Sequence, residues 1–252
     1  MAQRAVSFLT SAVGLSLGLS DLAAHGPVAA RLTGPMIPAG KESVILPMRS
    51  GQIVVMAIPR PLPAGTVVND LAQRVVWSGC DQAHKNWTSH VIVGSMHEVS
   101  TLANARDTTE DVVRVAEALA SAMPVEAVSW DGSGLFVQSA DFIRMAGASP
   151  WPPELLIRCE WRRSQEAAPN ALMVGTRGLG FFGLPELQDV TCDPDANAIR
   201  SRLLNLGSYL IANGPVIRDG DTIGAGEPRP IRVRNGTGPD GSPVLSLHSY
   251  NG

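Results

Sequence analysis

Cysteine is scarce in this sequence and forms no recognisable motif. Cys80, Cys159 and Cys192 are the only three, and no two of them make a CxxC pair. One cysteine would be left over if the other two formed a disulfide, which favours a reducing compartment over a secreted disulfide scaffold. We therefore expect a cytoplasmic protein.

An excess of positive charge is also lacking. The 20 Lys and Arg residues are outnumbered by 23 Asp and Glu, which gives a net charge of −3 and a pI near 5.9. Because nucleic-acid-binding proteins usually carry a strongly basic face, nucleic acid is not expected as a partner. No GxxxxGK[ST] pattern is present, which excludes a P-loop ATPase. We also expect no cofactor.

No apolar run has the roughly 20 residues needed to span a membrane. A mildly apolar run from Ala5 to Leu19 follows Arg4, and it has the outline of a secretory signal, although many Ser, Thr and Gly residues interrupt it. We interpret Val6 to Leu9 as an ordinary first strand and leave a signal peptide over residues 1–24 as the alternative. Gly14-Leu-Ser-Leu-Gly18 matches the nucleophile elbow of hydrolases, but a region this rich in Gly, Ser and Leu produces the match by coincidence.

The chain does have enough apolar residues for a substantial core. It is 252 residues long, 44% hydrophobic and 17% charged, which fits a folded protein of one large domain or two small ones. No low-complexity linker divides it, so we expect one compact unit over residues 1–252. The polar stretch from Glu160 to Pro169 is the single candidate boundary, which gives a subdivision into 1–163 and 170–252 as the alternative.

Strand and helix patterns alternate along the chain without an internal repeat. Runs typical of strands are Ser43 to Met48, Gln52 to Ile58, Trp87 to Met96, Val125 to Trp130, Leu135 to Val137, Leu155 to Arg162, Leu172 to Thr176, Ile231 to Arg234 and Val244 to Leu247. Runs typical of helices are Thr66 to Trp77, Thr108 to Met123 with Asp107 or Thr108 as cap, Ala140 to Met145 and Ile199 to Leu210. This order predicts an α+β fold, with antiparallel or mixed sheets covered by helices and with ferredoxin-like split βαβ modules as the preferred detail.

Two glycine-containing motifs invite a functional interpretation. Gly178-Leu-Gly-Phe-Phe-Gly183 matches GxGxxG, but Pro185 follows at once and no acidic residue stands about 20 residues later, so we expect a turn rather than a dinucleotide site. Asp219-Gly-Asp221 brings two carboxylates together, as a hard cation would need, yet Pro230 occupies the position of the bidentate Glu of an EF-hand. A turn in which the Asp side chains accept local amides is the preferred interpretation.

Histidines and tryptophans supply the remaining candidates. Cys80, His84, His90 and His97 lie close in sequence, but their spacing fits no compact zinc motif, so no metal site is expected. Trp87 is most simply a core residue, with a role as an interface anchor as the alternative.

Several sequence segments, taken in their order along the second half of the chain, resemble a bacterial family known only as a domain of unknown function. The most specific are Thr176-Arg-Gly-Leu179, Phe182-Gly-Leu-Pro-Glu-Leu187 and Asn213-Gly-Pro-Val-Ile-Arg-Asp-Gly-Asp-Thr-Ile-Gly224. With weaker matches upstream, the resemblance covers roughly Gln52 to Gly224. It implies a soluble cytoplasmic bacterial protein, and it transfers no catalytic residue because no reaction is established for the family.

Two hypotheses about function remain. The first is a non-catalytic protein-binding protein, in particular an immunity protein that neutralises a toxin, because an acidic surface suits a basic toxin domain. The second is a small-molecule-binding domain or an enzyme with a site around Arg177, Glu186, Asp219 and Asp221. The binding candidates are Arg177, Glu186, Asp219, Asp221, Thr222, Trp87 and His90. Convergence of the four charged residues on one pocket would favour the second hypothesis, and their use in turns would favour the first.

Overall fold

The computed structural model describes residues 6–11, 19–163, 172–191, 195–224, 230–238 and 240–249. The chain divides into two compact units, Met1–Leu156 and Ile157–Gly252, and each is described by itself below. That the whole chain forms one compact unit stays a prediction. Cys192 and the Gly14–Gly18 motif lie outside the described residues.

The first unit is built on a seven-stranded sheet. Its strands are β1 (Val6–Ser11), β2 (Ile37–Pro38), β3 (Ser43–Met48), β4 (Gly51–Ile58), β5 (Ser89–Ser95), β6 (Ala127–Trp130) and β7 (Leu135–Gln138). They lie in the order β2-β3-β4-β5-β1-β6-β7, and every neighbouring pair is antiparallel. The first strand of the chain is therefore an inner strand of this sheet.

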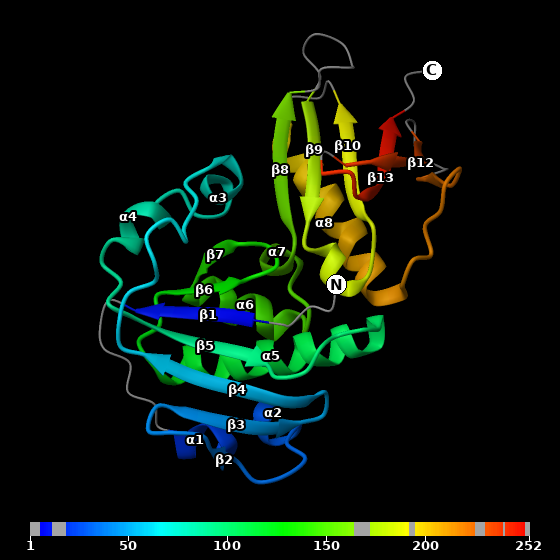
Figure 1. The fold of residues 1–252 in the computed structure, drawn as a ribbon. Helices are drawn as coiled ribbons and strands as arrows, with labels where there is room; N and C mark the ends of the chain where they lie inside the picture. The colour runs from blue at the N-terminus through cyan, green and yellow to red at the C-terminus, as the bar shows by residue number, and fades with distance from the viewer. Residues whose placement is uncertain are drawn as a thin grey trace. The chain divides into compact units, whose positions relative to one another are not determined.

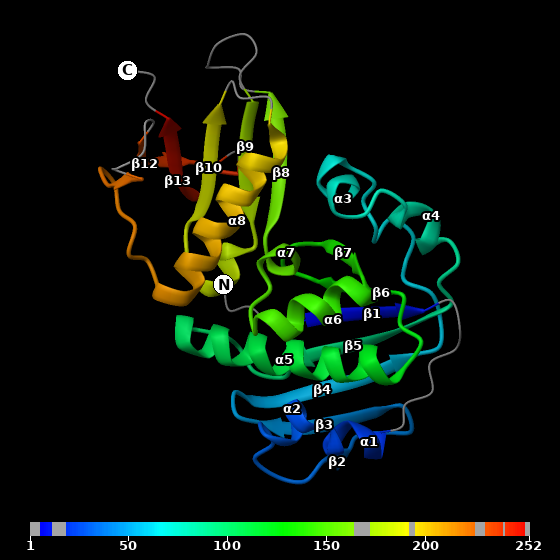
Figure 2. The same ribbon diagram turned by 180° about the vertical axis from the view of Figure 1, so that it is seen from behind.

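Helices cover the sheet of the first unit. They are α1 (Leu19–Ala24), α2 (Gly26–Ala29), α3 (Leu71–Val76), α4 (Cys80–His84), α5 (Leu102–Ala122), α6 (Ser139–Ala148) and α7 (Pro153–Leu156). Figure 2 shows α5 and α6 side by side on one face, where α5 contacts β1, β4 and β5. Apolar residues spaced along α5, such as Val112, Val115 and Leu119, are buried there, as their helical spacing predicts.

Capping residues set where the main helices begin. Thr101 accepts a hydrogen bond from Asn104 N and caps α5, so this helix begins a turn and a half earlier than predicted and its cap is neither Asp107 nor Thr108. Asp70 accepts from Gln73 N and caps α3, which shortens the helix expected from Thr66.

The second unit has a six-stranded mixed sheet with one long helix. The strands are β8 (Arg158–Arg163), β9 (Leu172–Arg177), β10 (Glu186–Thr191), β11 (Thr222–Ile223), β12 (Ile231–Thr237) and β13 (Pro243–Ser249), in the order β11-β12-β13-β10-β9-β8. β10 and β13 are parallel, and the other pairs are antiparallel. The 3₁₀ helix η1 (Leu179–Phe182) links β9 to β10, and α8 (Ala196–Asn213) packs on one face of the sheet (Figures 1 and 2).

The predicted α+β class is confirmed by both units. Whether they represent ferredoxin-like modules stays a prediction. Among the described residues, no helix combines the length and the hydropathy that crossing a membrane would require.

Candidate functional site

Glu186 holds together the turn that carries the glycine motif. Its Oε1 accepts hydrogen bonds from the amides of Gly178 and Gly180, both at 2.9 Å, and its Oε2 accepts from the Thr176 hydroxyl at 2.7 Å. The same hydroxyl accepts from Leu187 N at 2.8 Å and so joins the ends of β9 and β10. One carboxylate thus satisfies three donors around η1.

The glycine motif therefore forms a closed turn between two strands. Gly178 and Gly183 have φ values of 128° and 67°, which residues with a side chain rarely adopt. A phosphate-binding loop needs free amides at the start of a helix, whereas the Gly178 and Gly180 amides are already bonded to Glu186. The geometry agrees with a turn rather than a dinucleotide site.

The two carboxylates of Asp219-Gly-Asp221 are also engaged locally. Asp219 Oδ1 accepts from Asn235 N at 2.9 Å, and Asp221 Oδ2 accepts from Arg218 N at 2.8 Å. Both side chains are exposed. Asp219 fastens the turn before β11 to strand β12, and Asp221 closes the turn itself, as expected for Asp residues at turns.

Arg177 and Thr222 are two further exposed members of the predicted set. Arg177 ends β9 opposite Arg158 of β8, and within the described part of the chain it forms no ion pair with Glu186. Thr222 lies opposite Arg232 in the β11–β12 pair. Their side chains are free to meet a partner from solution.

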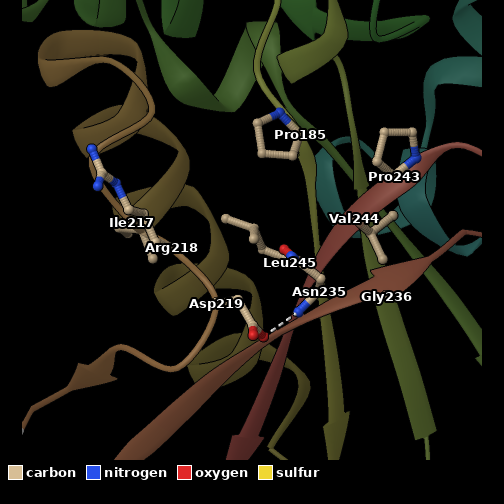
Figure 3. A pocket seen from close by; sticks show the side chains of 9 residues that line it. All are labelled: Pro185, Ile217, Arg218, Asp219, Asn235, Gly236, Pro243, Val244 and Leu245. Atoms are coloured by element: carbon tan, nitrogen blue, oxygen red, sulfur yellow. Dashed lines mark hydrogen bonds between the residues drawn. The ribbon is translucent and has the colours of Figure 1, made fainter.

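A pocket of about 410 Å³ opens beside the Asp219 turn. Its lining is mostly apolar: Pro185, Ile217, Arg218, Asp219, Asn235, Gly236, Pro243, Val244 and Leu245. In Figure 3 the Asp219 carboxylate points to Asn235 and the Arg218 guanidinium points away from the other side chains. Of the four charged residues whose convergence would favour a small-molecule site or an enzyme, only Asp219 lines this pocket.

The region that holds these turns matches a known family model. Residues 175–247 match a domain of unknown function (DUF4261). The predicted resemblance to such a family is confirmed for this stretch, which lies wholly in the second unit. The upstream part of the predicted coverage stays a prediction, whereas the match continues beyond Gly224. No curated protein and no solved structure matches the chain.

A basic surface, mostly within the matched region, was not singled out from the sequence. Buried Val174, Asp189, Val233 and Leu247 face α8, and Asp189 pairs with Arg202 of that helix at 3.5 Å. Residues on the opposite face of the same strands have no helix of this unit over them among the described residues (Figures 1 and 2). Six of them are basic: Arg158, which is buried, and five that we call the arginine face, Arg162, Arg177, Arg232, Arg234 and His248. Alternation of polar and apolar residues in Arg232-Val233-Arg234 is the signal that could have identified it.

The other two candidates, Trp87 and His90, lie in the first unit. Trp87 is 2% exposed, packs with Leu62, Cys80, Ala127 and Phe136, and donates from Nε1 to Glu126 Oε2 at 2.9 Å. His90 is buried, and its Nδ1 lies 2.9 Å from the carbonyl oxygen of Arg60, so Nδ1 carries the proton. These contacts stabilise the core, and a role for either residue in binding stays a prediction.

The histidines and cysteine that suggested a metal do not gather. His97 Nε2 lies 3.1 Å from Thr108 Oγ1, and His84 packs edge-on against Trp87, where burial lowers its pKa. Burial also raises the pKa of the Cys80 thiol to about 12. Nowhere in the described ranges do three His, Cys, Asp or Glu side chains cluster as metal ligands would.

A buried ion cluster in the first unit also went unpredicted. Arg31 is bonded to Asp111, which is fully buried, and Arg31 Nη1 lies 2.8 Å from Glu110 Oε2. The second oxygen of Asp111 accepts from Ser50 N at 2.9 Å. This cluster joins α2, α5 and the β3–β4 turn, and a fully bonded buried pair of this kind is a structural feature.

Proposed function

We propose that this chain is a non-catalytic protein-binding protein. The observation that carries the proposal is the use of Glu186, Asp219 and Asp221 in local hydrogen bonds, while Arg177 stays apart from them on the sheet. An active site would need such groups to face a common reacting centre. Because these side chains hold turns in place, they support a rigid binding surface rather than a catalytic role.

In its finer form, the proposal is a cytoplasmic immunity protein that neutralises a toxin in a bacterial host. The net charge of −3 supports it, because charge complementarity speeds encounter with a basic toxin domain. The free thiols of Cys80 and Cys159 support a reducing compartment.

The test is affinity capture of the tagged full-length chain from its host at about 0.15 M salt, followed by mass spectrometry. The captured protein is then purified separately, and its binding to the chain is measured by calorimetry. We expect a stoichiometric complex, and we expect the partner to stop growth when expressed alone and to be harmless when expressed with this chain. Absence of any stoichiometric partner would overturn the protein-binding proposal, and a harmless partner would overturn the immunity form alone.

A small-molecule-binding domain or enzyme remains the second candidate, and the 410 Å³ pocket beside Asp219 is the observation in its favour. A metabolite screen by thermal shift tests it, with Asp219→Asn as the variant and Asp131→Asn, in the β6–β7 turn of the other unit, as the matched control. A ligand whose stabilisation is lost in Asp219→Asn alone would favour this candidate over the first.

A further inference from the structure

We propose that the arginine face docks an acidic, extended segment of the protein partner. The inference rests on the proposed protein-binding function and names the surface and the chemistry that would serve it.

The basic groups stand on both sides of a neutral central strip. Across the sheet, Arg234 pairs with Ser246, Ser246 with Gln188, and Gln188 with Gly175. The side chains in the middle of this row are small or neutral, Arg234 stands at its β12 end, and Glu160, which pairs with Arg162, stands at its β8 end. A segment crossing the strip obliquely would meet Arg234 on β12 and Arg162 on β8.

The next row fixes the length of the segment that would fit. Arg232 pairs with His248 on β13, and on the far side Met173 pairs with Arg162 on β8, with β10 between them. Four strand spacings of about 4.8 Å separate the two arginines, which is about 19 Å. An extended peptide rises about 3.3 Å per residue, so a segment of about six residues reaches from one arginine to the other.

The cations on this face are available to an outside carboxylate. Arg177, Arg234 and His248 are exposed, and the side chain of Arg162 is 47% exposed although Glu160 pairs with it at 2.9 Å. Arg232 is partly exposed, and its buried Nε has no hydrogen-bond partner among the described residues.

The type of cation favours carboxylates of a protein over nucleic acid. Every positively charged side chain in residues 157–252, apart from histidine, is arginine, whose planar guanidinium binds a carboxylate through two parallel hydrogen bonds. Sheet faces that bind single-stranded RNA use aromatic side chains to stack bases, and the central strip of Ser246, Gln188 and Gly175 has none.

The test uses the full chain and three labelled probes: hexaglutamate, hexaglutamine and the single-stranded RNA hexauridylate. Affinities are measured by fluorescence anisotropy at low and at moderate salt. We expect hexaglutamate to bind about tenfold tighter than hexaglutamine and to weaken as salt rises. Arg162→Gln and Arg234→Gln, both at exposed positions, should each weaken it about threefold, and the double variant about tenfold. Arg144→Gln in α6 removes the same charge elsewhere and should change nothing.

The inference is overturned if hexaglutamate binds no tighter than hexaglutamine, or if Arg144→Gln weakens binding as much as the face variants do. It is also overturned if hexauridylate binds more tightly than hexaglutamate and depends on the same arginines. The captured partner separates the two proposals. If the double variant binds the captured partner as tightly as wild type, the docking surface is refuted and protein binding is not. If no partner is captured, protein binding is refuted, and the peptide measurements still decide whether the arginine face binds an acidic segment.

Discussion

Replacement of Glu186 is the sharpest test of how the matched region is held together. In Glu186→Ala, three donors lose their acceptor: the amides of Gly178 and Gly180 and the hydroxyl of Thr176. Gly180 is exposed, so water replaces its bond, and Thr176 lies 3.4 Å from the carbonyl oxygen of Leu187 as a weaker acceptor. The buried Gly178 amide is left without a partner, and this unpaired donor accounts for most of the decrease in the free energy of unfolding.

The magnitude follows from these three bonds. Hydrogen bonds to charged groups contribute about 1.5–3 kcal/mol each, and an unpaired buried donor costs about 1–3 kcal/mol. We therefore expect Glu186→Ala to lower the free energy of unfolding of the second unit by about 3 kcal/mol. Glu186→Gln keeps a carbonyl oxygen for the two amides, so we expect a loss of about 1 kcal/mol.

Hydrogen exchange in increasing urea is the suitable assay, because four of the five tryptophans lie in the first unit and fluorescence would report mainly on it. Peptides covering residues 172–191 should lose protection at lower urea in the order Glu186→Ala, Glu186→Gln, wild type. Exposed Glu98→Ala in the first unit serves as the control. Unchanged protection in Glu186→Ala would refute the structural role, and if partner binding fell at the same time, Glu186 would be a binding residue instead.

Three further predictions concern the first unit. Burial raises the pKa of the Cys80 thiol from 9.0 to about 12, so its stabilising contribution is complete below pH 9 and is lost as pH rises toward 12. The free energy of unfolding in urea should therefore fall less steeply above pH 9 in Cys80→Ala than in wild type. Equal slopes in the two proteins would contradict this. Arg31→Met leaves the Asp111 charge buried and should lower the free energy of unfolding in urea by about 3–5 kcal/mol. Arg31→Met combined with Asp111→Leu removes both charges and should lower it by less. A larger loss in the double variant would contradict the role of the buried charge. The Gln73 side chain bonds both the N–H and the carbonyl of Phe136, so Gln73→Met should cost about 2–4 kcal/mol, and a change below 1 kcal/mol would show that the strand does not need this support.

Local patterns predicted much of the fold. The strands predicted at Ser43 to Met48 and Gln52 to Ile58 are confirmed, and they pair as a hairpin because the short turn at Arg49-Ser50-Gly51 joins them locally. The start of α5 was misjudged because Asp107 and Thr108 are residue types that often cap helices, whereas Thr108 is fully buried within the helix beside His97 and Asp111 is buried beside Arg31. Tertiary contacts of this kind cannot be inferred from the spacing of apolar residues along the chain.

The candidate site was only partly accessible to such reasoning. Sequence analysis correctly favoured a turn for Asp219-Gly-Asp221, since Asp and Gly at turns have a local cause. The β10 strand was not predicted, because Glu186 and Asp189 make its pattern polar, although one carboxylate faces a turn and the other is buried against α8. The arginine face was missed for a related reason: it exists only once β8, β9, β12 and β13 are placed in register.

The inner position of β1 has a consequence for the order in which this protein is made. Val6–Ser11 is synthesised before both of its neighbours in the sheet, β5 and β6, which end at Ser95 and Trp130. At about 5–20 residues per second, synthesis of the intervening chain takes several seconds or more, during which the strand has no place in the sheet. The sheet of the first unit can therefore close around β1 only after Trp130 has been synthesised, although β1 itself is made long before.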